Sequence, residues 1–317
     1  MADPGAGRFA PSPSGHLHVG NLRTAVLAWL FARSTGRRFL IRVEDLDRVR
    51  AGAEADQLSE LTALGLTSDT PVVRQSERTD LYARALSDLT RQGLVYECFC
   101  TRRDIAEAAS APHARPGFYP GTCRALSPGE RDRRRAVRPP ALRLKADVDS
   151  WRVEDLLAGT VSAPVDDVVL RRNDGAIAYN LAVVVDDAAQ GVDQVVRGDD
   201  LLESAPRQAY LAALLGLAAP VYAHVPLAVT TAGRRLAKRD GAVTLEDLAG
   251  LGWRVPAVLE VILASLHLPG QSLDAALDVF DPGRLPRGPW MVDPEILFST
   301  ATGPARTSSA PTDKVSP

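Results

Sequence analysis

The sequence predicts an α/β fold whose helices alternate with the strands of a parallel sheet. A strand, a glycine-containing loop, a helix and a second strand follow one another within residues 8–43, a spacing that suits a parallel crossover. Helical patterns then alternate with short loops over residues 52–96, and another helix is predicted after residue 204. These three segments together support the α/β class.

The crossover unit begins at a brief apolar strand, residues 8–10, which ends before Pro11. The following helix has apolar residues at helical spacing, and its pattern stops at Gly36, as expected for a C-terminal glycine cap. Residues 39–43 form an apolar run that predicts a buried strand. The residues that carry the helical pattern are Leu22, Val26, Trp29 and Leu30.

Turn and cap residues predict further elements. Strands at residues 168–170 and 177–185 flank the turn Asn-Asp-Gly at residues 173–175, which is a hairpin signal. Ser204 is a typical N-cap, and Pro206 lies in the first turn of the helix that it begins.

Changes in composition divide the chain into five segments. Residues 97–145 are polar, rich in Arg and Pro, and contain every cysteine, whereas helical patterns return between Thr244 and Leu266. The last 20 residues are rich in Ser, Thr, Pro and Ala, which predicts disorder. The predicted segments are residues 1–96 and 146–243 for two halves of the main domain, 97–145 for an insertion, 244–297 for a small helical domain and 298–317 for the tail.

The bulk composition is that of an ordinary globular protein. Of 317 residues, 45% are hydrophobic and 24% are charged, and the formal net charge is −2, so any basic surface must be local. No apolar run approaches the roughly 20 residues that span a bilayer, and no secretory signal begins the chain. Three cysteines make a poor disulfide framework. A cytoplasmic location without a membrane partner is therefore expected.

The stretch PSPSGHLHVGNLRTA, residues 11–25, predicts a phosphate-binding loop. A helix N-terminus offers unpaired N–H groups and a partial positive charge, and Gly15 and Gly20 allow the backbone to approach a ligand. His16 and His18 lie two positions apart, so either could donate to a phosphate oxygen. The alternative is a glycine turn with two surface histidines.

A basic loop lies far downstream, with the sequence TTAGRRLAKR at residues 230–239. A mobile loop that carries Lys238 could clamp a triphosphate and stabilise the charge that develops as pyrophosphate leaves. The alternative is a solvated basic turn.

HVGN at residues 18–21 paired with RLAKR at residues 235–239 resembles the two signatures of class I aminoacyl-tRNA synthetases. The sequence around these two signatures narrows the resemblance to one family within this class. RFAPSPSGHLHVGNLRTA, RVEDLD, YNLAVVVDD and VVRGDDLL occur in the order found in the glutamyl-tRNA synthetase catalytic domain, over about residues 8–245. The resemblance implies a Rossmann-like, doubly wound parallel sheet. Ala237 departs from the family, whose lysine loop usually has Ser there.

The length of the chain separates two branches of this family. Only 78 residues follow Arg239, which would suffice for a small helical domain but not for the large anticodon-binding part of a glutamyl-tRNA synthetase. The chain thus resembles the truncated paralogues, the glutamyl-Q tRNA(Asp) synthetases. That resemblance implies activation of L-glutamate with ATP without tRNA, followed by transfer of glutamate to the queuosine base in the anticodon of tRNA(Asp). A monomer is expected.

The family match assigns roles to residues at the two signatures and the strand ends. His18 and Lys238 are the expected catalytic residues, and Mg²⁺ would accompany ATP. The expected ATP contacts are His16, His18, Gly20, Asn21 and Lys238. The expected glutamate contacts are Arg8, Phe9, Ala10, Pro11, Ser12, Glu44, Tyr179 and Arg197. Arg8 suits a side-chain carboxylate, and Glu44 suits the ammonium group; Glu44 could otherwise be a solvated acid.

The cysteines predict a structural zinc site. Cys98, Cys100 and Cys123 supply three thiolates, and a tetrahedral site lacks one ligand. Composition alone nominates His113, whereas the family pattern C-F-C…Y-P-G-T-C supplies Tyr119, which we follow. The alternative is three buried free cysteines. Bound zinc would order an insertion that otherwise lacks a core.

Several alternatives stay open. Eight Lys or Arg residues against two acids between residues 124 and 145 form either a solvated face or a patch for tRNA phosphates. A short glutamyl-tRNA synthetase that charges a tRNA 3′ end is one rival function, and a catalytically silent RNA-binding paralogue is another. A third rival is a different nucleotidyltransferase with an H-x-G-H signature, which the glutamate-pocket residues disfavour.

Overall fold

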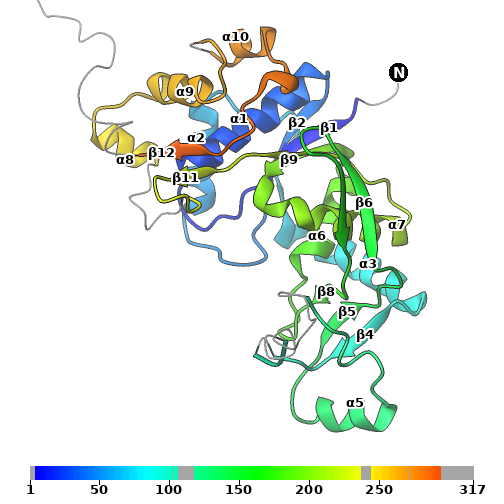
Figure 1. The fold of residues 1–317 in the computed structure, drawn as a ribbon. Helices are drawn as coiled ribbons and strands as arrows, with labels where there is room; N and C mark the ends of the chain where they lie inside the picture. Colours follow the sequence, from blue (N-terminus) through cyan, green and yellow to red (C-terminus); the bar gives the residue numbers. More distant parts are fainter. Residues whose placement is uncertain (1–3, 102, 106–117, 237–243, 271, 294–317) are drawn as a thin grey trace, which may run out of the picture.

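The computed structural model describes residues 4–101, 103–105, 118–236, 244–270 and 272–293. Its main sheet contains β1 (Ala6–Phe9), β2 (Arg38–Val43), β3 (Val73–Arg74), β6 (Ser150–Asp155), β7 (Gly159–Pro164), β9 (Val192–Gly198) and β10 (Val221–Val225). The strand order is β3-β2-β1-β9-β10-β6-β7 (Figure 1). Neighbouring strands from β3 across to β6 are parallel, and β7 joins the edge antiparallel to β6.

Helices cover both faces of this sheet. Helix α1 (Val19–Ser34) packs on β1, β2 and β9, and α7 (Ala205–Leu214) packs on β6 and β7. Successive residues of β2 point to opposite faces, so Phe39 and Ile41 join the core beside α1, whereas Leu40 joins a second core with residues of α7. Both faces are buried, which confirms the predicted doubly wound sheet.

The order in which strands are added to the sheet changes sides at β1: β2 and β3 lie on one side of it, and β9 and β10 lie on the other. Strand β1 lies between β2 on one side and β9 on the other, and all three are parallel. The loops that leave β1 and β9 therefore diverge, and a crevice for ligands forms outside the carboxyl ends of such strands. Phe9 and Gly198 are the last residues of these two strands.

The C-terminal helices complete the core rather than forming one of their own. α9 (Val255–Ala264) and α10 (Leu273–Asp278) pack on α1 and share its hydrophobic cluster, and α8 (Leu245–Gly250) packs on α9. Strand β12 (Trp290–Val292) then pairs in parallel with β11 (Ala228–Thr230). Further helices lie, in sequence order, between the strands of the main sheet. They are α2 (Ala53–Ala63), α3 (Thr79–Arg91), α6 (Tyr179–Ala189) and the 3₁₀ helices Gln75–Arg78 and Asp199–Ser204 (η2), and a 3₁₀ helix at Pro282–Arg284 precedes β12.

A second, antiparallel sheet extends away from the main one. It consists of β4 (Val95–Cys98), β5 (Ala141–Leu144) and β8 (Val169–Arg171), and α5 (Pro128–Arg135) lies at its far end (Figure 1). Its own small hydrophobic cluster contains Tyr96, Cys98, Phe99, Tyr119 and Cys123. Among the described residues, the helices are all too short or too polar to cross a bilayer.

One predicted element is wrong. Residues 177–185, predicted as a strand, form a single antiparallel bridge at Ile177 and then enter helix α6 at Tyr179. The predicted turn exists, with the backbone N–H of Arg172 donating to Ala176 O at 2.8 Å. Residues 181–187 are all buried, and a helix buried on every side has no polar face to reveal its period.

Three expectations concern residues outside the described part of the chain. Lys238 and the zinc candidate His113 lie there, as does the predicted tail from residue 298.

Candidate active site

The start of α1 is built by the first signature. His18 is the N-cap, and its Nδ1 accepts a hydrogen bond from the backbone N–H of Asn21 at 3.2 Å. The Asn21 side-chain oxygen accepts in return from the backbone N–H of His18 at 3.3 Å. Because Nδ1 accepts, a neutral His18 ring carries its proton on Nε2. The signature therefore fixes both the helix start and the tautomer of its histidine.

Helix α2 holds the preceding loop in place. The Nε2 group of Gln57 donates to Gly15 O at 2.6 Å and to Ser12 O at 3.1 Å. Gly15 has φ +131°, a conformation that L side chains rarely adopt. Pro11 O accepts from the backbone N–H of Glu44 at 2.9 Å, so the loop is also tied to the end of β2.

A pocket of about 150 Å³ opens beside this loop, at the switch point of the sheet. It is bounded by two glycines whose positions leave no room for a side chain. A Cβ at Gly20 would lie 2.7 Å from the Cβ of Ala228, and one at Gly198 would lie 2.6 Å from Leu227. The residues that line it are Phe9, His18, Gly20, Asn21, Thr24, Gly198, Asp200, Leu201, Leu227, Ala228 and Arg235. The first signature and the basic loop thus meet here, where Arg235 pairs with Asp200.

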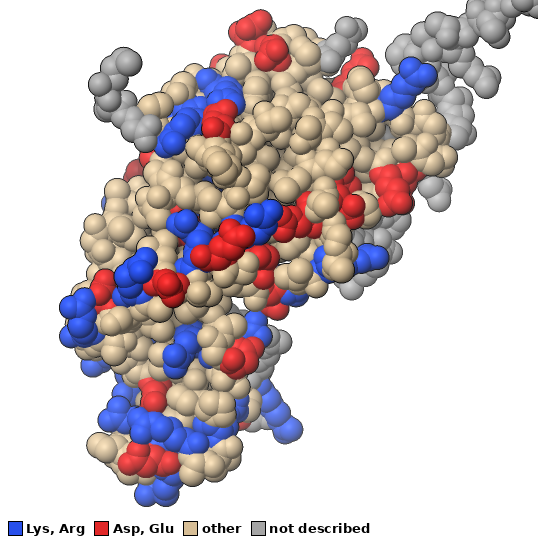
Figure 2. Space-filling model, turned by 180° about the vertical axis from the view of Figure 1, so that it is seen from behind, with Lys and Arg blue, Asp and Glu red and all other residues tan. Residues whose placement is uncertain are grey.

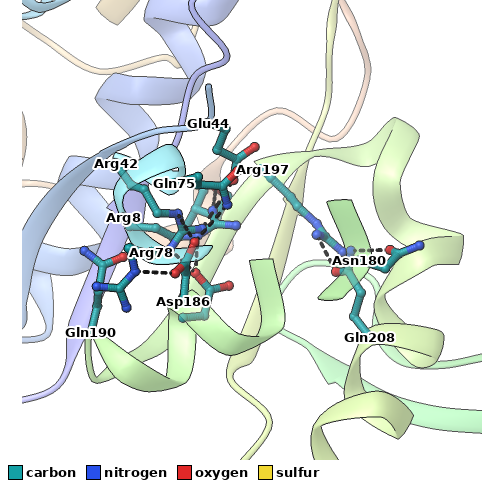
Figure 3. Close-up of polar contacts among 12 residues, drawn as sticks. Arg8, Arg42, Glu44, Gln75, Arg78, Asn180, Asp186, Gln190, Arg197 and Gln208 are labelled. Carbon is teal, nitrogen blue, oxygen red and sulfur yellow. Dashed lines mark hydrogen bonds and ion pairs between the residues drawn. The ribbon is translucent and has the colours of Figure 1, made fainter. Parts of the chain in front are cut away.

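Two buried arginines share one carboxylate next to the pocket (Figure 3). Asp187 Oδ1 accepts from Arg8 Nε at 3.2 Å and from Arg42 Nη1 at 2.8 Å. Arg8 is 4% exposed and Arg42 is fully buried. Although burial acts to raise the pKa of Asp187, the two guanidinium groups hold it below its ordinary value. Asp187 therefore stays ionised and orients both cations.

Glu44 follows β2 and lies in the same cluster. Its carboxylate is 3.3 Å from Arg42 Nη2, and the residue is 9% exposed. Burial raises its pKa above the ordinary value despite the opposing charges of Arg42 and Arg8. A desolvated carboxylate with a raised pKa beside a pocket is typical of a functional site.

Arg197 and Tyr179 reach the cluster from β9 and α6. Arg197 is buried, and its Nη1 donates to Gln208 Oε1 at 2.7 Å (Figure 3). Tyr179 begins α6 and is 41% exposed. Desolvation around its hydroxyl and the charge of Glu44 raise the pKa of Tyr179, whereas Arg197 and Arg8 act to lower it. These four side chains therefore lie within electrostatic reach of one another.

His16 is surrounded by acidic side chains of α2 and α8. Its Nδ1 lies 2.8 Å from a Glu60 oxygen in α2, and its Nε2 lies 3.0 Å from a Glu246 oxygen in α8. It is not among the described residues that line the pocket. In this arrangement His16 links the signature loop to α8, and its expected contact with ATP stays a prediction.

The three cysteines converge on Tyr119. Their Sγ atoms lie within 4.8 Å of one another, and the Tyr119 hydroxyl is 3.3 Å from Cys98 Sγ and 3.7 Å from Cys100 Sγ. Cys100 Sγ and Cys123 Sγ are 3.6 Å apart. A zinc tetrahedron with Zn–S bonds of about 2.3 Å has edges of about 3.8 Å, and the distance between Cys100 Sγ and Cys123 Sγ is close to that length. The three cysteines could hold a metal ion.

Sequence reasoning missed the residues that position the site. Arg42, Asp187 and Gln57 were not predicted as site residues, but they hydrogen-bond to groups that were or to the loop that carries them. A charged residue inside the apolar run FLIRV was the available signal for Arg42, and paired acids at the end of the apolar run in α6 were the signal for Asp187. Gln57 gave no signal, because its bonds to the loop are purely tertiary.

Comparison with known proteins agrees with this geometry. The family described as tRNA synthetases class I (E and Q), catalytic domain, matches residues 6–280. A glutamyl-Q tRNA(Asp) synthetase of Nocardia farcinica is 60% identical over 301 residues, which are 95% of this chain and 97% of that protein. One of Cutibacterium acnes is 55% identical over 271 residues, 83% and 76% of the two chains. A glutamate tRNA ligase of Elizabethkingia meningosepticum, solved in complex with its amino acid, has TM-score 0.77 and 26% identity over 92% of this chain and 68% of its own.

The doubly wound sheet, the capped loop at its switch point and the family match define the catalytic domain of a class I tRNA synthetase of the glutamate and glutamine type. Within that class, the level and extent of identity are decisive. The chain belongs to the glutamyl-Q tRNA(Asp) synthetase family.

Proposed function

We propose that this protein activates L-glutamate with ATP in the absence of tRNA and then transfers glutamate to the queuosine base in the anticodon of tRNA(Asp). One observation carries the proposal: the first signature and the basic loop meet in a pocket that adjoins a buried Arg8–Glu44–Arg197 cluster. Two cations and one anion match a substrate with two carboxylates and one ammonium group. The names of the relatives at 43–60% identity support the same activity.

The proposed chemistry joins two anions, so it depends on positioning and charge stabilisation. The glutamate α-carboxylate attacks the α-phosphorus of ATP, and pyrophosphate leaves with Mg²⁺ as part of the nucleotide substrate. His18 would donate from Nε2 to phosphate, beside the N–H groups of the α1 start. Gly20 and Asn21 would contact the nucleotide. Lys238 would stabilise the negative charge that develops on the leaving pyrophosphate.

The glutamate contacts are proposed to surround Glu44. Arg8 or Arg197 would bind the side-chain carboxylate, and Glu44 would bind the ammonium group. The backbone through residues 9–12 would form one wall, since Gln57 holds that loop rigid. Tyr179 would close the opposite side from the start of α6.

The tRNA is proposed to contact the end of the molecule that carries α5. Figure 2 shows a band of Lys and Arg side chains across this end, with acidic side chains on either side of the band. Arg133 and Arg134 are exposed on α5 and form no ion pair within 4 Å among the described residues, whereas Arg135 pairs with Glu97. Unpaired surface cations suit a phosphate backbone.

Cys98, Cys100, Cys123 and Tyr119 are proposed to hold one structural zinc ion. The backbone N–H of Cys123 donates to the Tyr119 hydroxyl oxygen at 2.9 Å, and the Arg143 guanidinium lies 3.8 Å above its ring. Both contacts would stabilise a phenolate. Four protein ligands leave no open position, so the ion would order this sheet and take no part in catalysis.

The decisive experiment is ATP–pyrophosphate exchange by the purified protein without RNA, across a panel of amino acids. Exchange with glutamate alone supports the proposal, whereas exchange only after addition of tRNA supports a glutamyl-tRNA synthetase. Absence of exchange under every condition supports a silent RNA-binding paralogue. Lys238→Ala should abolish exchange and Lys145→Ala, on the exposed insertion, should not.

Transfer is then measured with tRNA(Asp) that carries or lacks queuosine. Stable attachment of labelled glutamate only to the queuosine-containing tRNA is expected, and attachment at the 3′ end would contradict the proposal. Because its substrates would be ATP and tRNA, we propose that the protein acts in the cytoplasm, as a monomer whose mass light scattering can check.

A further inference from the structure

A chain of buried side chains lies behind Arg197 and extends from β9 across the neighbouring strands β10 and β6. Arg197 Nε donates to His224 Nε2 at 3.0 Å, and His224 Nδ1 lies 2.6 Å from Asp155 Oδ2. The side chains of His224 and Asp155 are fully buried. The three residues stand on the adjacent strands β9, β10 and β6, and Arg197 and His224 are register partners.

The chain has only one consistent proton arrangement. An arginine Nε always carries a proton, so His224 Nε2 must accept, and the ring proton must sit on Nδ1 and be donated to Asp155. Asp155 is itself fixed, because its other oxygen accepts from the backbone N–H groups of Leu157 and Ala158, each at 2.8 Å. The Asp155 carboxylate therefore fixes the tautomer of His224. That tautomer leaves Nε2 unprotonated, so that it can accept from Arg197 Nε.

Arg197 is held at three points. In addition to His224, Gln208 Oε1 accepts from Nη1 at 2.7 Å, and Leu201 O accepts from Nη2 at 3.3 Å. Each terminal nitrogen keeps a second N–H group, which is the pair that a carboxylate binds in bidentate geometry. Loss of the Nε bond would free the planar group to rotate about its stem.

We propose that His224 is a positioning residue that holds the Arg197 guanidinium in the orientation required to bind a substrate carboxylate, with Asp155 fixing its tautomer. This inference rests on the proposed role of Arg197 in glutamate binding.

A consequence is that glutamate binding weakens in acid. Burial lowers the pKa of His224, Arg197 and Arg8 act in the same direction, and Asp155 acts to raise it. The neutral ring thus persists at neutral pH, and a proton added to Nε2 at lower pH turns the acceptor into a donor that faces the Nε–H of Arg197. The groups that face His224 are Asp155 on β6, Arg197 on β9, Arg8 on β1, Asp199 on η2 and Tyr222 on its own strand.

The test compares His224→Leu with His224→Gln in glutamate-dependent exchange. His224→Leu removes the acceptor, and the glutamate KM should rise about tenfold or more while the ATP KM changes less than about twofold. His224→Gln can present an amide oxygen near the Nε2 position and should recover most of the affinity. Wild-type KM for glutamate should also rise as the pH falls through the lowered pKa of His224. The rise should be smaller in His224→Gln, where only the protonation of Glu44 contributes.

Other outcomes overturn the inference. An unchanged glutamate KM in His224→Leu, or equal increases in both KM values, would show that His224 only supports the fold. If His224→Leu does not fold, the ¹⁵N shifts of the His224 ring in wild-type protein decide, because a proton on Nε2 contradicts the proposal. Wild-type protein without any glutamate exchange overturns the proposed function together with this inference, whereas normal wild-type exchange with an unaffected variant overturns this inference alone.

Discussion

Buried charges are concentrated next to the pocket, where Arg8, Arg42, Glu44 and Asp187 are all at most 9% exposed. Removing such groups from water costs several kcal/mol each, so they persist only when partners compensate them. Asp187 compensates two cations at once, whereas Glu44 keeps a raised pKa. Asp187 and Glu44 therefore have different roles, and their variants should differ in stability and in glutamate KM.

Asp187→Asn should destabilise the protein by about 3–5 kcal/mol, because it leaves Arg8 and Arg42 without their shared anion. Asp193→Asn is the matched control: Asp193 pairs with Arg37 at a half-exposed site, and its loss should cost about 0–1 kcal/mol. Urea unfolding measures both values.

The pH dependence of Asp187 follows from its lowered pKa. Its stabilising contribution is present above the ordinary aspartate value of about 3.9 and disappears as the pH falls through the native pKa. Wild-type stability should therefore fall in this acid range more steeply than that of Asp187→Asn. Equal losses from Asp187→Asn and Asp193→Asn at pH 7 would contradict the assignment.

Glu44→Gln should leave the free energy of unfolding at pH 7 unchanged or higher, while the glutamate KM rises about tenfold or more. Because burial raises the native pKa of Glu44, the native state keeps a proton that the unfolded chain releases, and stability falls as the pH rises from about 4.3 through the native pKa. Urea unfolding at two pH values and exchange kinetics measure the two effects. A large loss of stability would mean that Glu44 supports the fold.

At the scale of elements, the start of α1 is where a strand end, a capped helix and β11 meet. Gly20→Ala should reduce exchange sharply and destabilise by about 1–3 kcal/mol, because the new Cβ would lie 2.7 Å from Ala228 and 3.0 Å from the His18 ring. Gly250→Ala in α8 is the control, since no described residue outside the local helix backbone would come within 4 Å of the added Cβ. That control should be neutral or slightly stabilising, and equal effects would refute the steric argument.

The proposed zinc site would stabilise the second sheet, because Cys98 ends β4. Purified protein should contain about one zinc ion per chain by elemental analysis, and Tyr119→Phe should lower that content or its resistance to a chelator. Tyr96→Phe is the matched control, because the Tyr96 hydroxyl belongs to the same cluster but donates to Asp167 at 2.5 Å instead of facing the thiols. Metal-free wild-type protein that is stable and active would end the zinc proposal.

For the whole molecule, catalysis and tRNA contact are expected to lie at separate places. The double variant Arg133→Gln/Arg134→Gln should leave glutamate-dependent exchange unchanged and weaken transfer to tRNA, with a smaller salt dependence. Arg254→Gln/Arg284→Gln removes two exposed cations near α9 and α10, at the opposite end in Figure 1, and should alter neither. Transfer that is insensitive to the α5 variant would make this band a solvated face.

Elements with local signals could be predicted from the amino-acid sequence. The helical pattern of α1, the glycine stop at Gly36 and the strand at residues 39–43 follow from neighbours within a few positions, and the structure confirms them. Ordered motifs also identified the family before any geometry was known. The domain divisions stay predictions. The roles of the site residues also stay predictions, because no contact with a ligand tests them.

The residues that orient the site are set by contacts between distant segments of the chain. Asp187 meets Arg8 across 179 positions, and Asp155 meets His224 across 69, so neither pair leaves a local pattern. The secondary structure of residues 177–185 also depends on tertiary packing, because the helix that their apolar run forms is buried on every side. Local sequence fixes caps and periods through short-range hydrogen bonds, whereas burial and charge pairing depend on which distant segments the sheet brings together.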